Sequence, residues 1–334
     1  MTALHAKSPC CRGGVIRFGK RRRQCIQCRH TWRIRLKKRG RKKGSASPFL
    51  IGKYINKEIP SCYTLAKIKP RKSKDWLERR LRRSLARFIN TIPWPAPPTK
   101  QPCIAVADAM MIIIDKQLYT FYFILVRAVS GYLATIMEPY SKEGKESLDG
   151  WHEAFNRLPE DVRQSICALT SDGHYGLTSY ARINGWHTQL CHFHIIAKLQ
   201  GRRSQWARSR HRALGKRLYF LVKEIITNPD EYVIIPYLHE IDLIRCQTSS
   251  RQLRTYLSGF IKRYRDYRTH LKYPELNLPR TSNSAEALIG SIRNLCYRAR
   301  GFRTIHSLSL WIQAILKHKK TVTCNGHLPT KLMR

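Results

Sequence analysis

Acidic residues are scarce in this chain of 334 residues. Its 21 Asp and Glu stand against 63 Lys and Arg, which gives a formal net charge of +42. An excess of this size predicts a polyanionic partner, and nucleic acid is the expected one. A membrane surface is the weaker alternative, because the positive charge is spread along the chain and no long apolar segment accompanies it.

Long apolar runs are also missing. The longest, near residues 103–114 and 118–126, are too short for a transmembrane helix or are interrupted by Asp108, so no membrane span is expected. No apolar segment typical of a secretory signal follows the N-terminus. The eleven cysteines are odd in number and widely scattered, which argues against a disulfide framework and favours a reducing compartment. The length leaves room for two or three domains.

Four cysteines gather in a basic N-terminal region, residues 1–45. Cys10 and Cys11 precede a basic loop, and Cys25 and Cys28 form a Cys-x-x-Cys pair. Two such knuckles are the layout of a zinc ribbon, in which thiolates are the soft ligands that Zn²⁺ prefers. The region is therefore a candidate zinc site.

The first knuckle departs from the usual ribbon pattern. Ser8 stands where the first cysteine of a Cys-Pro-x-Cys knuckle would be. Adjacent cysteines are expected to point in different directions, so Cys10 and Cys11 would not bind one ion together. Either His5 or His30 then completes the four ligands, or the ribbon is decayed and its thiols are free.

Residues 46–92 predict three short helices. Prolines separate them, and Ser73 is placed to cap the third, over residues 74–90. Three short helices with a basic last one predict a helix-turn-helix whose final helix enters the major groove of DNA. A basic helical spacer is the alternative. Residues 93–101 are rich in proline and predict a stiff linker.

Two basic segments supply the expected DNA contacts. The run that follows the cysteines predicts a flexible phosphate-binding linker, with a plain solvated linker as the alternative. The third predicted helix is basic on the face opposite its apolar one. The residues concerned are Lys37, Lys38 and Arg39 in the run, and Arg79, Arg80, Arg82 and Arg83 on the helix.

Residues 166–194 carry chemically active side chains just past two neighbouring strands. An apolar run over residues 166–169 predicts a strand, and Asp172 follows it in an Asp-Gly pair. A second strand, about residues 186–190, leads into Cys191-x-x-His194. In open α/β sheets, ligands and metals are held beyond the C-terminal ends of strands. Asp172 is therefore a candidate metal ligand, although an Asp-Gly pair alone is more often a turn.

Residues 102–138 predict three consecutive strands that form an antiparallel meander, and a helix over about residues 145–157 follows. Asp108 lies inside the first strand, whereas Asp115 belongs to the turn after it. An aspartate in an apolar strand is costly unless it is paired or metal-bound, so Asp108 is a stronger candidate ligand. The order of elements resembles an α/β (α+β) RNase H-like core. In that fold the first and fourth strands are neighbours, which would bring Asp108 and Asp172 together.

The region from about residue 200 to residue 280 is helical and basic, and its clearest helices are expected over residues 205–226 and 251–271. A further helix begins near Ser282 or Asn283, with Glu286 in its first turn. Asn283 and Glu286 also fit a capping box, in which the acid would serve only the helix start. A last amphipathic helix is predicted over residues 305–317.

In this order the motifs resemble those of the DDE transposases of bacterial insertion sequences, near the Mutator-type branch. The resemblance covers most of the chain. It rests on the Cys-x-x-Cys ribbon, the helix-turn-helix, Val106-Ala-Asp108, Ser171-Asp172-Gly173, Cys191-His-Phe-His194, and Thr281-Ser-Asn-Ser-Ala-Glu286 before Arg300-Gly-Phe302.

The resemblance implies a catalytic domain over residues 102–334, with a helical insertion at about 200–280. Asp108, Asp172 and Glu286 would bind two Mg²⁺ or Mn²⁺ ions. Carboxylates suit these hard cations, and two such ions support in-line cleavage of a phosphodiester. Cys191 and His194 would be the auxiliary pair of the family, with a packed thiol and a core histidine as the alternative.

The activity implied is cleavage at the ends of a DNA element, followed by attack of the freed 3′-hydroxyl on target DNA. The partners would be double-stranded terminal repeats, target DNA and a second copy of the chain, in a cytoplasmic, nucleoid-associated setting. One alternative is a catalytically inactive, transposase-derived DNA-binding regulator, against which the intact set of three carboxylates argues. Another is an RNA-directed nuclease or RNA-binding ribbon protein, which would not need the helix-turn-helix.

Overall fold

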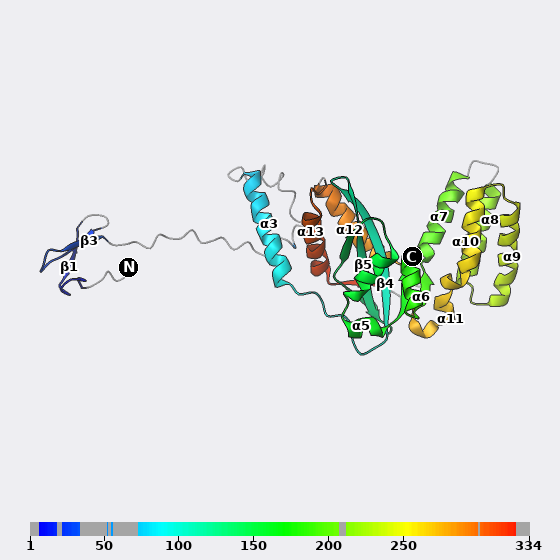
Figure 1. The fold of residues 1–334 in the computed structure, drawn as a ribbon, viewed down its shortest axis with the longest axis horizontal. Helices are drawn as coiled ribbons and strands as arrows, with labels where there is room; N and C mark the ends of the chain where they lie inside the picture. The colour runs from blue at the N-terminus through cyan, green and yellow to red at the C-terminus, as the bar shows by residue number, and fades with distance from the viewer. Residues whose placement is uncertain are drawn as a thin grey trace, which may run out of the picture. The chain divides into compact units, whose positions relative to one another are not determined.

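The chain forms two compact units in the computed structural model, Met1–Ser47 and Pro48–Arg334. The smaller unit contains the strands β1 (Val15–Arg17), β2 (Arg22–Cys25) and β3 (Thr31–Arg33). They pair antiparallel in the order β1-β2-β3 (Figure 1). The structure describes residues 7–18, 22–33, 52, 55, 73–206, 212–299 and 301–324.

A mixed sheet forms the centre of the larger unit. Its strands are β4 (Cys103–Ile114), β5 (Gln117–Ala128), β6 (Leu133–Ile136), β7 (Tyr140–Glu143), β8 (Ile166–Ser171), β9 (His187–Leu190) and β10 (Thr321–Thr323). The order is β10-β6-β5-β4-β8-β9, and β7 pairs with β5. The predicted meander of β4, β5 and β6 is confirmed, and β8 and β9 run parallel to β4. Asp115 and Lys116, both with positive φ, form the two-residue turn between β4 and β5.

Helices cover both faces of this sheet (Figure 1). On one face lie α4 (Leu148–Asn156), α5 (Glu160–Ser165) and α6 (Tyr175–Ile183), and on the other lie α12 (Asn283–Ala299) and α13 (Ile305–Lys319). Successive side chains of β4 point to opposite faces of the sheet, as in any pleated strand. Ala105 and Ala107 pack in the cluster with α4 to α6, whereas Val106 and Met110 pack in the cluster with α12 and α13.

The third predicted helix of the N-terminal region is present as α3 (Lys74–Thr91), capped by Ser73. Its buried residues Leu85, Phe88 and Ile89 pack against Ala314 of α13. The buried Lys317 amine also donates a hydrogen bond to the Ile89 carbonyl, at 2.8 Å. Through these contacts α3 joins the larger unit. Of the first helix predicted in this region, only residues 52 and 55 are described, and both are helical. The second predicted helix and the run Lys37, Lys38 and Arg39 lie outside the described residues.

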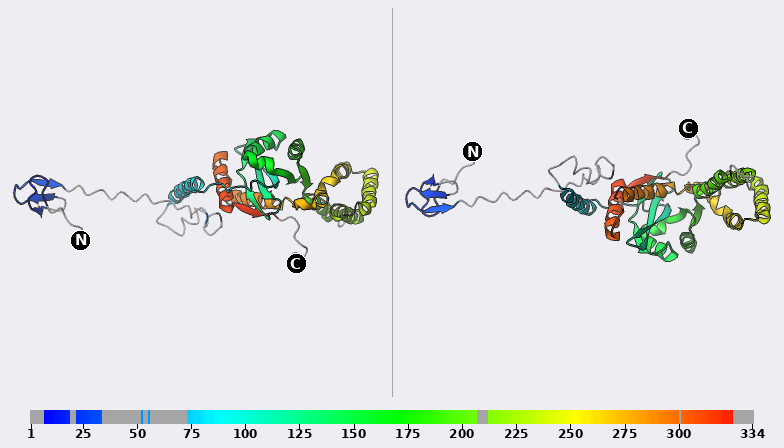
Figure 2. Two further views of the ribbon diagram at one scale, coloured as in Figure 1. Left: turned by 90° about the horizontal axis from the view of Figure 1, so that it is seen from below. Right: turned by 90° about the horizontal axis from the view of Figure 1, so that it is seen from above.

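A helical insertion with its own apolar core follows β9 and projects away from the sheet (Figure 2). Its elements are α7 (His192–Gln205), α8 (Arg212–Thr227), α9 (Glu231–Gln247), α10 (Arg251–Arg263), the 3₁₀ turn η1 (Tyr264–Tyr267), α11 (Thr269–Lys272) and the 3₁₀ turn η2 (Pro274–Leu276). The described part of the chain has no helix that combines the length and apolarity needed to cross a membrane.

Several short elements differ from the sequence-based expectation. The helix expected from residue 145 begins at Leu148, because the Ser147 side chain accepts a hydrogen bond from the Gly150 amide and caps it. The edge strands β7 and β10 and the one-turn helix α5 were not predicted. In the insertion, α9 contains Pro236 and has apolar residues on all sides, so it lacks the one-sided pattern that reveals a surface helix.

Candidate active site

The parallel pairing of β4 and β8 brings two of the predicted carboxylates together. Val106 is in register with Thr170, so two residues further on Asp108 lies beside Asp172, which directly follows β8. The predicted adjacency of the strands that carry them is therefore confirmed. Gly173, with a φ of +93°, makes the turn after Asp172, a conformation that favours glycine.

Asp108 faces α12. It has the same parity along β4 as Val106 and Met110, which pack against that helix. Burial, the negative charge of Asp172 and, more weakly, that of Glu286 together raise the pKa of Asp108 to about 7, against a hydrogen bond from the Ala109 amide and the charge of His194. The half-buried carboxylate of Asp108 thus lies beside other negative charges.

Glu286 lies in the first turn of α12, close enough to Asp108 for its charge to act on that carboxylate. The Glu286 amide donates to the Ser282 carbonyl, so Ser282 is the residue before the helix. A capping box would then place its acid at Ala285, three residues later, and Glu286 is one position beyond. The expected alternative in which Asn283 and Glu286 form a capping box therefore does not describe this helix start. The Ser282 hydroxyl lies 3.4 Å from Glu286 Oε1.

Cys191 and His194 converge on the same place. The Cys191 amide donates to the Ser171 carbonyl at 2.8 Å, which fixes the cysteine next to Asp172. His194 lies in the first turn of α7, with its Nδ1 atom 3.4 Å from Glu286 Oε1. One ligand atom from each of Cys191, His194 and Glu286 lies within 4.8 Å of the others. Interaction with the Cys191 side chain raises the pKa of His194 to about 9, although burial opposes it.

His192 behaves differently from His194. Its ring is buried, and its Nε2 atom lies 2.6 Å from the Tyr267 carbonyl oxygen. Burial lowers the pKa of His192 to about 4, so the ring is neutral at physiological pH. His192 is thus a core histidine with its hydrogen bond satisfied, and His194 is the one that faces the carboxylates.

The three predicted carboxylates are near one another but not in mutual contact. Among the described residues, only two groups of three or more Cys, His, Asp or Glu have ligand atoms within 4.8 Å of one another, and Asp108 and Asp172 belong to neither. Glu286 instead points toward His194 and Ser282.

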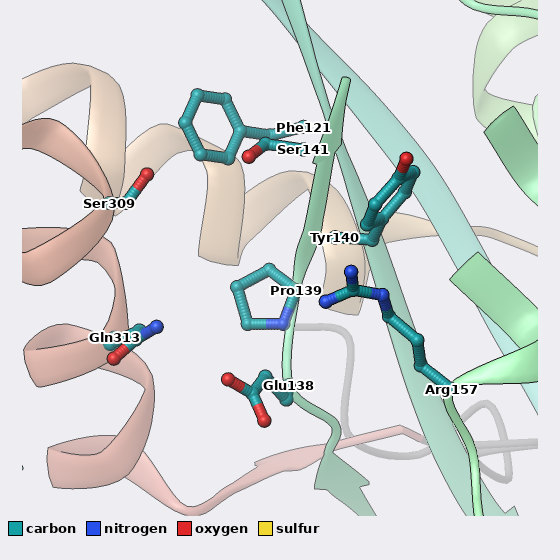
Figure 3. Close-up of a pocket in the computed structure, with 8 residues that line it drawn as sticks. All are labelled: Phe121, Glu138, Pro139, Tyr140, Ser141, Arg157, Ser309 and Gln313. Carbon is teal, nitrogen blue, oxygen red and sulfur yellow. The ribbon is translucent and has the colours of Figure 1, made fainter. Parts of the chain in front are cut away.

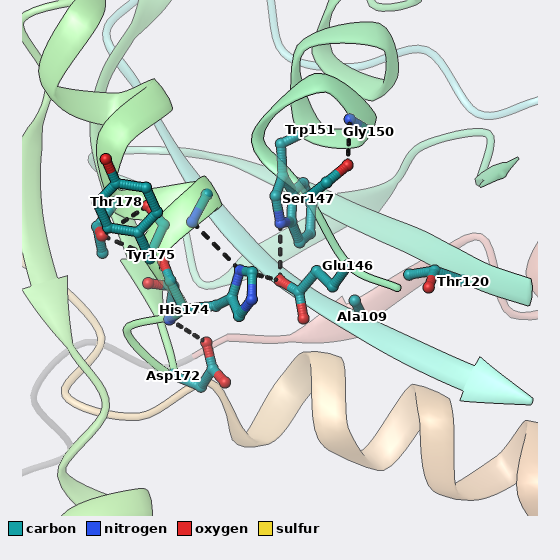
Figure 4. A network of polar contacts seen from close by, with 12 residues as sticks. Ala109, Thr120, Glu146, Ser147, Gly150, Trp151, Asp172, His174, Tyr175 and Thr178 are labelled. Carbon is teal, nitrogen blue, oxygen red and sulfur yellow. Dashed lines mark hydrogen bonds and ion pairs between the residues drawn. The ribbon is translucent and has the colours of Figure 1, made fainter. Parts of the chain in front are cut away.

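A fourth carboxylate, which the sequence did not reveal, lies beside Asp172. Glu146 Oε1 accepts from the Trp151 indole N–H at 2.8 Å and lies 3.0 Å from His174 Nδ1 (Figure 4). The His174 amide in turn donates to Asp172 Oδ1 at 2.9 Å. Burial and, more weakly, the charge of Asp172 raise the pKa of Glu146 to about 7, against the indole hydrogen bond. Glu146 lies just before a helix and in no recognisable motif. The scarcity of acidic residues was therefore the one feature of the sequence that could have singled it out.

The helical insertion is attached to the ends of β8 and β9. The Arg263 guanidinium donates to the Gly173 carbonyl at 3.0 Å, directly after Asp172. The side-chain amide of Gln189 donates to the Tyr267 carbonyl at 3.0 Å, and the Thr269 hydroxyl donates to the Thr188 carbonyl. A movement of the insertion would therefore displace the turn that carries Asp172.

The four N-terminal cysteines also converge. Cys10 Sγ lies 2.9 Å from Cys28 Sγ, and Cys11 Sγ lies 3.2 Å from Cys25 Sγ. All four sulfurs lie within 4.8 Å of one another, so they can hold one zinc ion. The expectation that Cys10 and Cys11 would not bind one ion together is wrong: both lie in a tight turn, in which the Arg12 amide donates to the Ser8 carbonyl at 3.0 Å, and both sulfurs belong to the group.

The other expected partners of this cysteine cluster are not needed. Ser8 is buried, and its hydroxyl lies 2.7 Å from Cys10 Sγ, so it contacts a ligand without replacing one. His30 is exposed and stacks on Trp32, with ring centroids 6.3 Å apart. His5 lies outside the described residues.

The predicted DNA-binding arginines of α3 are exposed. Arg79, Arg80, Arg82 and Arg83 lie on the side of the helix away from its packed face. Arg82 borders a cavity of about 800 Å³ between α3 and the segment that joins α12 to α13. A second, smaller cavity of about 210 Å³ lies between β7 and α13, where Glu138 and Arg157 face it (Figure 3). Neither cavity is lined by a predicted active-site residue.

No protein-family model matches the chain, and no curated protein sequence matches it.

Proposed function

We propose that this chain is a DDE-type transposase, which binds the ends of a DNA element and cleaves and joins phosphodiester bonds with two Mg²⁺ or Mn²⁺ ions. The observation that carries the proposal is the parallel pairing of β4 and β8, which sets Asp108 beside Asp172 on the face covered by α12 and its Glu286. The order of strands supports an RNase H-like core: a meander of three antiparallel strands, then two strands parallel to the first.

The residues of the site fit divalent cations. Asp108 is half-buried near two other carboxylates, and its pKa is raised first by burial and then by their negative charge. Asp108 would bind both ions, whereas Asp172 and Glu286 would each bind one. When bound, the two ions would activate the attacking hydroxyl and stabilise the charge that develops on the phosphate. Mg²⁺ and Mn²⁺ take oxygen ligands, so the carboxylates rather than Cys191 would hold them.

The remainder of the chain would bind and orient DNA. The exposed arginines of α3 would contact phosphates, and the cysteine cluster would hold Zn²⁺ and stabilise a basic unit that is too small for a large apolar core. The contact between Arg263 and the Gly173 carbonyl would let the helical insertion position the turn that carries Asp172.

DNA cleavage by the purified full-length chain tests the proposal. The substrates are duplexes that cover the two flanks of its coding sequence, incubated with Mg²⁺. We expect cleavage at defined positions near the element ends, and a loss of at least about 10³-fold in Asp172→Ala, because that carboxylate holds an ion at the reacting phosphate. Asp115→Asn, which removes a carboxylate from a turn outside the site, is the matched control and should cleave normally.

The same assay separates the enzyme from a DNA-binding regulator. Specific binding to these ends without cleavage under any divalent cation would favour the regulator. Equal cleavage by the wild type and Asp172→Ala would place the activity elsewhere.

A further inference from the structure

We propose that Cys191, His194 and Glu286 form a second zinc site, which shares Glu286 with the Mg²⁺ centre and so blocks that centre when it is filled. The inference deepens the proposed function, since the exclusion of Mg²⁺ matters only if Glu286 serves catalysis. Zinc binding itself does not depend on that function and is tested separately.

The distances and donor types of this group fit zinc. One sulfur, one imidazole nitrogen and one carboxylate oxygen lie within 4.8 Å of one another. Zn²⁺ binds such mixed sets, and three protein ligands with an open fourth position are common for it. Mg²⁺ disfavours thiolate and imidazole ligands, so the set selects a softer ion.

The neighbours of the three ligands are arranged for a metal. The Ser282 amide donates to Cys191 Sγ at 3.2 Å, a contact that favours the thiolate, and the Ser282 hydroxyl lies 3.4 Å from Glu286 Oε1. His194 Nδ1 is buried and makes no hydrogen bond of good geometry among the described residues; it lies 3.4 Å from Glu286 Oε1, and its ring interacts with the Cys191 side chain. A buried nitrogen without a partner is costly, and a bound ion would satisfy it.

Rigid elements hold the ligands. Cys191 is fully buried and follows β9, His194 is on the first turn of α7, and Glu286 is on the first turn of α12. The His192 amide donates to the Arg280 carbonyl at 2.8 Å, which ties the start of α7 to the segment before α12. Zinc can therefore enter with little rearrangement, and the thiol proton of Cys191 passes to solvent.

Zinc at this site would compete with Mg²⁺ for Glu286. The described structure turns Glu286 toward His194 rather than into a cluster with Asp108 and Asp172. A carboxylate held by zinc in this position is withdrawn from Mg²⁺. Zinc would thus inhibit cleavage, and excess Mg²⁺ would relieve the inhibition.

Zinc stoichiometry of the full-length chain tests the site. Protein stripped with chelator is reloaded with Zn²⁺, freed of excess, and its zinc is released to a chromogenic chelator. We expect Cys191→Ser to hold one equivalent less than the wild type, and Cys246→Ser, an exposed cysteine outside both clusters, to hold the same amount. In a Cys25→Ser/Cys28→Ser background, Co²⁺ should still give a thiolate-to-metal absorption band, and adding Cys191→Ser should remove it.

A second variant guards against misfolding of Cys191→Ser. Glu286→Gln changes a partly exposed side chain, and it should keep the fold while lowering zinc affinity at this site by at least about tenfold. Unchanged zinc content in Cys191→Ser together with unchanged affinity in Glu286→Gln would overturn the inference. If the site loads zinc but no DNA is cleaved, the proposed function fails and the zinc site stands. If cleavage occurs and zinc at the site does not inhibit it, the shared role of Glu286 is wrong.

Discussion

Four carboxylates lie near one end of the sheet in a chain that has only 21 acidic residues. Asp108 and Asp172 are paired by strand register, Glu286 faces them from α12, and Glu146 reaches Asp172 through His174. Burial and like charge raise the pKa of Asp108 and Glu146, so ionising both carboxylates costs free energy. Divalent ions bound as in the proposed function would offset that cost.

Replacing Glu146 with Gln should change how stability depends on pH. The pKa of Glu146 is about 7 in the folded chain, above its ordinary value of 4.5. Between these values the folded state keeps a proton that the unfolded state loses, so stability falls as pH rises through this window. Because the side chain is only 14% exposed, the full loss is on the order of 3 kcal/mol. Glu146→Gln should therefore be more stable than the wild type by ~1–3 kcal/mol at pH 8 and by little at pH 4.

Urea unfolding of the metal-free proteins at both pH values gives this difference. Glu275→Gln, which alters an exposed carboxylate in the 3₁₀ turn η2, is the matched control and should follow the wild type. A Glu146→Gln variant less stable than the wild type at pH 8 would mean that the contacts with His174 and Trp151 outweigh the burial of charge.

At the scale of elements, α3 has two faces with different tasks. Its apolar face packs on α13, and its arginines remain exposed. We expect the double change Arg82→Ala/Arg83→Ala to weaken DNA binding about equally for all sequences and to reduce the slope of log affinity against log salt by about two, because each arginine contacts one phosphate. Fluorescence anisotropy over a salt series measures this slope.

A basic residue outside α3 provides the control for this change in slope. Lys223→Ala removes an exposed positive charge from α8 and should leave the slope unchanged. If the two variants lower the slope of log affinity against log salt alike, α3 has no special role in DNA binding, and only the total charge of the chain matters.

The sequence predicts long elements better than short ones. Strands β4 and β5 were predicted because apolar and β-branched residues run through them, and Asp108 stood out because it interrupts such a run. β10 has only three residues and depends on pairing with β6, a tertiary contact that no local pattern reveals. The long helix α9 is an exception: it was not distinguished within the predicted helical region, because its apolar residues lie on several sides.

The candidate site was also predictable where local sequence patterns mark it, and not where it depends on tertiary contacts. Asp172, Cys191 and Glu286 follow strands or begin helices, positions that sequence patterns mark well. The partners that depend on the fold were not predictable: Glu146 comes from the segment before α4, and Arg263 from the insertion. The convergence of Cys10 and Cys11 depends on the local turn over residues 8–12, which the cysteine spacing does not indicate.

At the scale of the whole molecule, a net charge of +42 predicts binding that is dominated by phosphate contacts. We expect the affinity of the full-length chain for duplex DNA to fall by about 10³-fold or more between 50 and 200 mM salt, because bound DNA releases its counterions. Measurements at several salt concentrations give the slope directly. An affinity that hardly changes with salt would exclude DNA as the principal partner.

The most direct measurement of the central claim is the anomalous scattering of Mn²⁺ in crystals of the chain bound to a DNA end. We expect two peaks about 4 Å apart, one contacted by Asp108 and Asp172 and the other by Asp108 and Glu286, beside the phosphate to be cleaved. Well-ordered carboxylates without a peak between them, or a single peak held by Cys191 and His194 alone, would contradict it.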